Sequence, residues 1–241
     1  MPTVKRPAAL ATAYGAALKK IEARDIPTLL IQAGQPMYRS IDPNSSHTAL
    51  PKPPPGTHVS TFLANQLLIP GDGALDLKNR FTGPSYNPGI PSATGLYCVL
   101  QQQALVNESI HYSGKAGAWA LSGRCVLRIV LMGSVLVADL SPHNPRAVRF
   151  LRELGAGTWD QMTDPEDCSV ARGIGLAVAQ SGFLHGLAVQ TVRSSERSAD
   201  ESGDNLVLFA AQGAAVRGLY IDQVSFYGKR ASPEVFPVAF P

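Results

Sequence analysis

One carboxylate in the sequence lies where a predicted helix is apolar. Glu108 follows Leu105 by three residues and Ala104 by four, in a segment predicted to be helical over residues 102–112, so the three side chains share one face. A carboxylate at the edge of a buried face tends to have a raised pKa and needs a partner. Glu108 is therefore a catalytic candidate. A solvated helix glutamate also fits the pattern, and the pair of Glu108 and His111 alone is weak evidence for a metal site.

An arginine in a stretch rich in glycine and proline is the second candidate. Arg80 lies within residues 70–95, where little regular structure is expected, and long ordered loops are often functional. A guanidinium group held among glycines can reach a phosphate with its planar fork. An arginine with only a surface role fits the same pattern. Arg39, which follows Tyr38, has the same two interpretations.

The other motifs in the sequence are weaker indications of function. Gly173 and Gly175 suggest a dinucleotide-binding loop, but the third glycine of that motif is replaced by Val178 and no strand leads in. Close helix packing explains these glycines better. The hydroxyl groups near residues 191–195 lack the GxSxG context of a serine nucleophile, and the histidines show no triad spacing.

The composition indicates a folded and mildly basic chain. It has 241 residues, 45% hydrophobic and 16% charged, with a net charge of +3. This charge suits a small anionic ligand, and no run of lysines and arginines argues for direct binding of nucleic acid.

Cysteine usage and hydropathy predict a cytoplasmic location with no membrane anchor. Cys98, Cys125 and Cys168 form no CxxC pair and no metal-ligand spacing, which is typical of reduced cytosolic thiols. The longest apolar run, 126–140, is interrupted by Arg128 and is too short to span a bilayer. No signal-peptide core is visible at the N-terminus.

The patterns of apolar and turn residues predict an α+β fold with a small mixed β-sheet core and surrounding helices. Helices are expected at residues 8–23, 102–112, 146–154 and 165–180, and strands at 96–100, 126–130, 135–140, 187–192 and 206–210.

Several short blocks, taken in order, resemble the RES domain, which is named for an arginine, a glutamate and a serine. The resemblance covers about residues 37–210. The most specific part is Tyr97 together with Ala104 through Glu108. The similar blocks are Met37–Arg39, Asn79–Phe81, Gly95–Tyr97, Ala104–Glu108, Val137–Ser141, Gly186–Arg193 and Asn205–Phe209.

The resemblance implies a fold related to ADP-ribosyltransferases and a toxin that degrades NAD. The family cleaves the nicotinamide–ribose bond, by hydrolysis or by phosphorolysis with inorganic phosphate as co-substrate, and uses no other cofactor. By this resemblance Glu108 stabilises the developing positive charge on the ribose, Tyr97 stacks on nicotinamide, and Arg80 clamps phosphate. The resemblance assigns the remaining substrate-binding roles, toward NAD or phosphate, to Arg39, Thr191, Arg193 and Ser194.

The sequence departs from the family pattern in two places. Arg80 and Tyr97 are seventeen residues apart, which an insertion at 82–94 would explain. The family serine is replaced by Thr191, which keeps the hydroxyl, and Ser194 or Ser195 would substitute for it only if the loop shifted.

The resemblance also implies partners and a domain division. Residues 1–35 are expected to form a helical extension and residues 36–241 the RES-like catalytic domain. The expected partner is a cognate Xre-type antitoxin, which would contact DNA in place of this chain, and homo-oligomerisation is left open. Two other activities fit the same residues: transfer of ADP-ribose to a protein, and binding by a catalytically inactive module.

Overall fold

The architecture was established from a computed structural model. It describes residues 3–41, 80–106, 121–155, 157–164, 166–190, 204–210, 218–228 and 233–238. Glu108, Thr191, Arg193, Ser194 and Ser195 lie outside these described residues.

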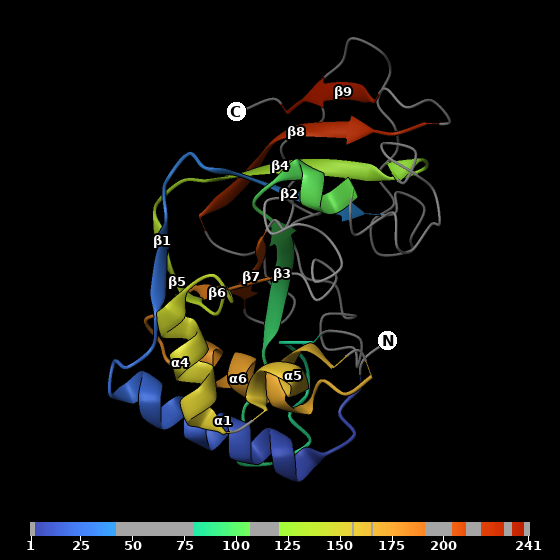
Figure 1. The fold of residues 1–241 in the computed structure, drawn as a ribbon. Helices are drawn as coiled ribbons and strands as arrows, with labels where there is room; N and C mark the ends of the chain where they lie inside the picture. Colours follow the sequence, from blue (N-terminus) through green and yellow to red (C-terminus); the bar gives the residue numbers. More distant parts are fainter. Residues whose placement is uncertain are drawn as a thin grey trace.

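A curled sheet of nine strands forms the centre of the molecule (Figure 1). Its strand order is β1-β5-β6-β7-β3-β2-β4-β8-β9, and every neighbouring pair is antiparallel except β5 and β6. The mixed α+β class is therefore confirmed, but the sheet is larger than the small core predicted from the sequence. The strands are β1 (Thr28–Ile31), β2 (Pro36–Ile41), β3 (Thr94–Val99), β4 (Cys125–Leu131), β5 (Val135–Asp139), β6 (Gly186–Gln190), β7 (Asp204–Ala210), β8 (Leu219–Phe226) and β9 (Glu234–Pro237).

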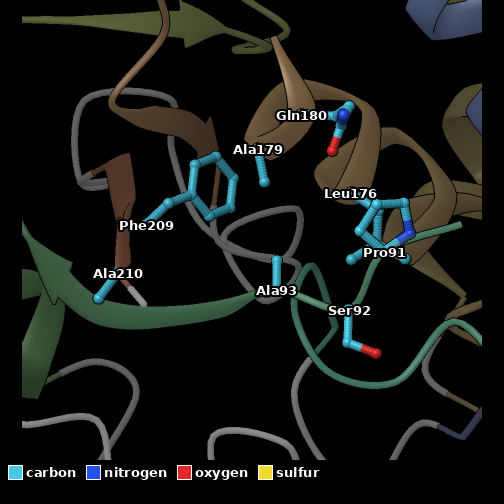
Figure 2. Close-up of a pocket in the computed structure, with 8 residues that line it drawn as sticks. All are labelled: Pro91, Ser92, Ala93, Leu176, Ala179, Gln180, Phe209 and Ala210. Atoms are coloured by element: carbon cyan, nitrogen blue, oxygen red, sulfur yellow. The ribbon is translucent and has the colours of Figure 1, made fainter. Parts of the chain in front are cut away.

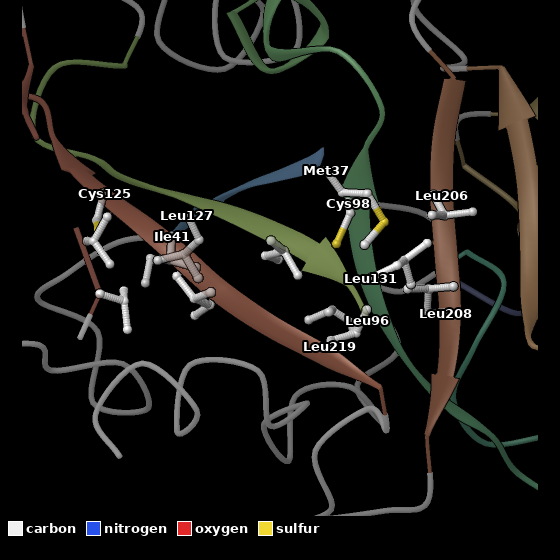
Figure 3. Close-up of a cluster of buried hydrophobic side chains, with 14 of the residues drawn as sticks. Met37, Ile41, Leu96, Cys98, Cys125, Leu127, Leu131, Leu206, Leu208 and Leu219 are labelled. Carbon is white, nitrogen blue, oxygen red and sulfur yellow. The ribbon is translucent and has the colours of Figure 1, made fainter. Parts of the chain in front are cut away.

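The two largest apolar clusters among the described residues lie on opposite faces of this sheet. One consists of side chains from all nine strands, including Met37, Leu96, Cys98 and Leu127 (Figure 3). The other packs the opposite face of the sheet against helices α1 (Pro7–Glu22), α4 (Pro145–Leu154), α5 (Thr158–Thr163) and α6 (Ser169–Gln180). Because successive residues of a strand point to opposite faces, neighbours in the sequence contribute to different clusters.

Helix α1 belongs to the helical layer. Pro7 occupies its first turn, and Leu10, Ala17 and Ile21 are almost completely buried on one face. This face lies against α6, where a Cβ atom built on Gly173 would come within 2.4 Å of the Leu10 carbonyl oxygen. Strand β1 follows and pairs with β5. The division of the chain at residue 35 stays a prediction from the sequence.

Most elements expected from the sequence are present, with one shifted boundary. Helix α6 begins at Ser169 and not near residue 165, because the Asp164 carboxylate accepts hydrogen bonds from the backbone of Glu166 and Asp167 and holds a turn there. The Asp167 carboxylate then accepts a hydrogen bond from the Ser169 backbone N–H at 2.9 Å. Strands β1, β2, β8 and β9 and helix α5 were not predicted.

Candidate active site

The site begins at strand β3, whose residue Tyr97 points toward the helical layer. Tyr97 packs against the cluster between the sheet and the helices, whereas its neighbours Leu96 and Cys98 are buried in the cluster on the other face. The side chain is half-buried, and its burial raises the pKa of the phenol above its ordinary value. The hydroxyl therefore stays protonated at neutral pH.

The Tyr97 hydroxyl holds the backbone next to Arg80. The backbone N–H of Phe81 donates a hydrogen bond to this oxygen at 3.0 Å, and the Thr82 hydroxyl lies 3.4 Å from it. Because the phenol is anchored at its hydroxyl, the position of the ring is fixed. The backbone that carries Arg80 is therefore tied to Tyr97 through Phe81.

The loop between these residues explains their distance in the sequence. Gly83 and Ala93 exchange backbone hydrogen bonds of 2.7 and 3.4 Å, which closes the loop at its base. Inside the loop, the Ser85 hydroxyl donates to the carbonyl of Ile90 at 2.5 Å. Residues 83–93 therefore form a closed loop, and the residues before and after it become neighbours.

Helix α6 clamps the same backbone from the other side. A Cβ atom on Gly175 would lie 2.1 Å from the carbonyl oxygen of Phe81, so only glycine allows this approach. The N–H of Phe81 thus donates to Tyr97 on β3, and the carbonyl of Phe81 packs closely against Gly175 on α6. The two glycines of the Gly173-x-Gly175 pair have separate packing roles, Gly173 against α1 and Gly175 against Phe81, which confirms the helix-packing interpretation.

Arg80 is oriented by helix α5. Its Nη1 donates a hydrogen bond to the backbone carbonyl of Met162 at 2.8 Å, and the side chain is half-buried. This contact directs the guanidinium group toward α5.

A second arginine, which sequence reasoning missed, strengthens the positive charge here. Arg172 on α6 is fully buried and acts electrostatically on both Tyr97 and Cys168, and Arg80 also acts on Cys168. Burial is the largest effect on Cys168 and raises the pKa of its thiol. A signal was present in the sequence, because Arg172 is the only charged residue in the helix Ser169–Gln180.

Arg39 lies elsewhere. Tyr38 on β2 faces Val99 on β3, so the next pair along these antiparallel strands is Arg39 and Cys98. Burial lowers the pKa of the Arg39 guanidinium and raises the pKa of the Cys98 thiol to about 12. Because Cys98 and Tyr97 point to opposite faces of β3, the sheet separates Arg39 from Tyr97. The structure brings Arg80 and Tyr97 together and leaves Arg39 outside this group.

The ends of the described strands show where the segments that hold Thr191 and Glu108 leave the described part of the chain. Gln190, which precedes Thr191, pairs with Asp204 at the start of β7, and the next residue, Asn205, pairs with Val99 at the end of β3. Residues 102–106 are helical, and the segment with Glu108 follows them. Both segments thus leave the described chain near the same end of β3.

A hollow of about 270 Å³ lies at the other end of β3 (Figure 2). The ring of Phe209 extends toward Ala179 there, and none of the residues that line the hollow is charged. Since a pyrophosphate group needs cationic or N–H donors, this hollow does not suit it. Its lining consists of Pro91, Ser92, Ala93, Leu176, Ala179, Gln180, Phe209 and Ala210.

Among the described residues, no cluster of three or more His, Cys, Asp or Glu side chains is arranged to hold a metal ion. In the same ranges no helix is long and apolar enough to cross a membrane. Comparisons of the chain with protein-family models, with curated proteins and with solved structures found no match.

Proposed function

We propose that this chain degrades NAD by cleaving the bond between nicotinamide and ribose. The observation that carries the proposal is the hydrogen bond between Phe81 and Tyr97, because it ties the backbone next to Arg80 to Tyr97, and these two predicted catalytic residues are seventeen positions apart in the sequence. Nothing in composition requires Arg80 and Tyr97 to meet, and the closed loop 83–93 brings them together.

The chemistry of the described residues suits this substrate. NAD carries an anionic pyrophosphate and a planar nicotinamide ring. The guanidinium of Arg80, with the charge of Arg172 nearby, favours the anion, and the anchored ring of Tyr97 offers a surface for stacking. Arg39 is given no role in this proposal, because the sheet separates it from Tyr97.

The bond-breaking step assigns a role to Glu108. When the C1′–N bond breaks, nicotinamide leaves with the bonding electrons and the ribose becomes oxocarbenium-like. A nearby carboxylate stabilises that charge, and C1′ then bonds either to water, which releases a proton to the solvent, or to an oxygen of inorganic phosphate. The products are nicotinamide with ADP-ribose, or nicotinamide with phosphorylated ADP-ribose. The hydroxyl of Thr191, with Arg193 and Ser194, is proposed to bind phosphate or ribose.

The proposal includes a cognate antitoxin as partner. Expression of the active chain is then expected to stop bacterial growth, and a small DNA-binding partner is expected to neutralise it. Normal growth of cells that hold abundant soluble wild-type protein would contradict this part of the proposal.

The deciding experiment measures NAD consumption by the purified chain. NAD labelled in its adenylate phosphate is incubated with the protein, with and without inorganic phosphate, and the products are separated by chromatography. Free ADP-ribose indicates hydrolysis, and its phosphorylated form indicates phosphorolysis. Added lysate proteins that become labelled would indicate transfer of ADP-ribose instead. If folded protein leaves NAD intact in both buffers, the chain is not an NAD-degrading enzyme.

A further inference from the structure

Helix α4 presents a row of arginines to solvent. Arg146, Arg149 and Arg152 are exposed and follow one another at intervals of three residues, while Ala147, Phe150 and Leu151 are buried against the core. The helix contains one acidic residue, Glu153, which forms ion pairs with Arg149 at 2.7 Å and with Lys20 at 2.5 Å. The exposed face of α4 is therefore positively charged.

A hollow of about 310 Å³ lies at one end of this row, between α4 and α5. Arg152 belongs to its lining, and the half-buried side chains of Val148 and Trp159 add apolar surface. Gly155 and Gly157 also belong to the lining, and Gly157 has a φ of 77°, a conformation that other residues rarely adopt. The complete lining is Pro142, Val148, Leu151, Arg152, Gly155, Gly157, Thr158, Trp159 and Asp160.

We propose that this surface docks an acidic segment of a partner protein, with one apolar side chain of that segment inserted into the hollow. Charge complementarity carries the choice of partner: the arginines would pair with carboxylates of the segment, while Val148 and Trp159 would pack against the inserted side chain. Protein interfaces commonly combine a buried apolar anchor with charged pairs around it.

A peptide fits this surface better than nucleic acid does. The hollow is partly apolar and has the exposed carboxylate of Asp160 in its lining, which a uniformly anionic phosphate backbone would meet with repulsion. Three arginines on ten residues of helix also offer few phosphate contacts. A segment of mixed composition can place its carboxylates on the arginines and avoid Asp160.

The surface is distinct from the candidate active site but is joined to it through α5. Trp159 lines the hollow, and Met162, one helical turn later, accepts the hydrogen bond from Arg80. A segment seated in the hollow would therefore contact the helix that orients Arg80.

Selection from a random peptide library tests the proposal without assuming a sequence. The full chain is used as bait, and the selected consensus peptide is labelled with fluorescein and titrated by fluorescence anisotropy. We expect peptides that combine acidic residues with an aromatic or large aliphatic residue, and affinity that falls as salt is added. Arg152→Glu is expected to weaken binding by about tenfold, since it replaces attraction with repulsion beside the anchor.

Lys19→Glu is the matched control, because it makes the same charge change at an exposed position on α1 and is expected to change affinity less than about twofold. Circular dichroism establishes that both variants are folded. The proposal is overturned if no acidic peptide is enriched, or if Arg152→Glu and Lys19→Glu weaken binding equally. It is also overturned if a 20-base-pair DNA duplex binds through these arginines while the peptides do not.

Discussion

The backbone N–H of Phe81 donates a hydrogen bond of 3.0 Å to the hydroxyl of Tyr97, and this bond joins strand β3 to the segment that carries Arg80. Without this bond, the backbone N–H of Phe81 would lose its hydrogen-bond acceptor in a partly buried environment just before the closed loop. The position of Arg80 therefore depends on a residue that the sequence places seventeen positions away.

Tyr97→Phe removes only the hydroxyl and should destabilise the fold. We expect a loss of about 1–2 kcal/mol in the free energy of unfolding, because a partly buried N–H loses its acceptor. Urea unfolding followed by circular dichroism measures it. Tyr86→Phe is the matched control, since Tyr86 is 50% exposed, and it should leave stability unchanged. Equal stability of the two variants would mean that the Phe81–Tyr97 bond contributes nothing.

Gly175→Ala should be far more harmful than Gly15→Ala, although both glycines lie in helices. A methyl group on Gly175 would meet the Phe81 carbonyl oxygen at 2.1 Å, whereas Gly15 has nothing within 4 Å. We expect Gly15→Ala to stabilise the protein by up to about 1 kcal/mol through helix propensity. Gly175→Ala should cost about 2 kcal/mol or more, or prevent soluble expression. Thermal unfolding of both variants gives the comparison.

Periodicity and turn residues were sufficient to predict helices α1, α4 and α6 and strands β3 to β7. Helix 146–154 is recognisable because Asn144 and Pro145 precede it and Gly155 follows it, and the structure has α4 at Pro145–Leu154. Strands β8 and β9 were not predicted, although Gly218, with a φ of 73°, lies directly before β8. The shifted start of α6 shows the limit of cap patterns, since both Asp164 and Asp167 can hold a turn.

The candidate site was predictable only in part. The order of motifs indicated Arg80 and Tyr97, but no sequence pattern shows that residues 83–93 close on themselves. Likewise, Arg39 was grouped with Arg80 by residue type, although strand pairing puts it on the other face of the sheet. Long-range pairing decides such questions, and a single sequence does not reveal it.

Stability should fall in acid as Asp167 becomes protonated. Burial alone would raise the pKa of this carboxyl, but hydrogen bonds from Ser169, Arg6 and Lys5 outweigh it and lower the pKa to about 2. Because the folded pKa lies below the unfolded value near 3.8, the stabilisation is complete above about pH 4 and is lost as the pH falls toward 2.

Urea unfolding of wild type and Asp167→Asn across this range measures the effect. The wild type should be more stable by about 1–2 kcal/mol at pH 7, and the two curves should converge near pH 2. A difference that does not change with pH would show that the carboxylate charge is not the cause.

Deletion of residues 1–34 should unfold the chain. It removes α1, whose Leu10, Ala17 and Ile21 are buried against the helical layer, and it removes β1 from the edge of the sheet. Each large apolar side chain contributes about 1.5–3 kcal/mol by burial, so the sum is comparable to the whole stability of a domain. Soluble, cooperatively unfolding protein from residues 35–241 would instead support the division predicted from the sequence. Deletion of residues 1–2 alone serves as the control for altering the terminus.

The sharpest test of the proposed reaction compares Glu108→Gln with two arginine variants. Gln keeps the size and hydrogen bonding of Glu108 but removes its charge. If that charge stabilises the oxocarbenium-like ribose, kcat should fall by about a hundredfold, or about 3 kcal/mol, while KM for NAD changes little.

Arg80→Ala should raise KM as well, because it removes the proposed contact between the guanidinium and phosphate. Arg39→Ala is the matched arginine control and should affect KM less, since the sheet separates Arg39 from Tyr97. Thr191→Ala should cost less than Glu108→Gln if its hydroxyl only assists binding. A folded Glu108→Gln protein with wild-type turnover would remove the catalytic carboxylate from the proposal, and equal effects of the two arginine variants would place the substrate elsewhere.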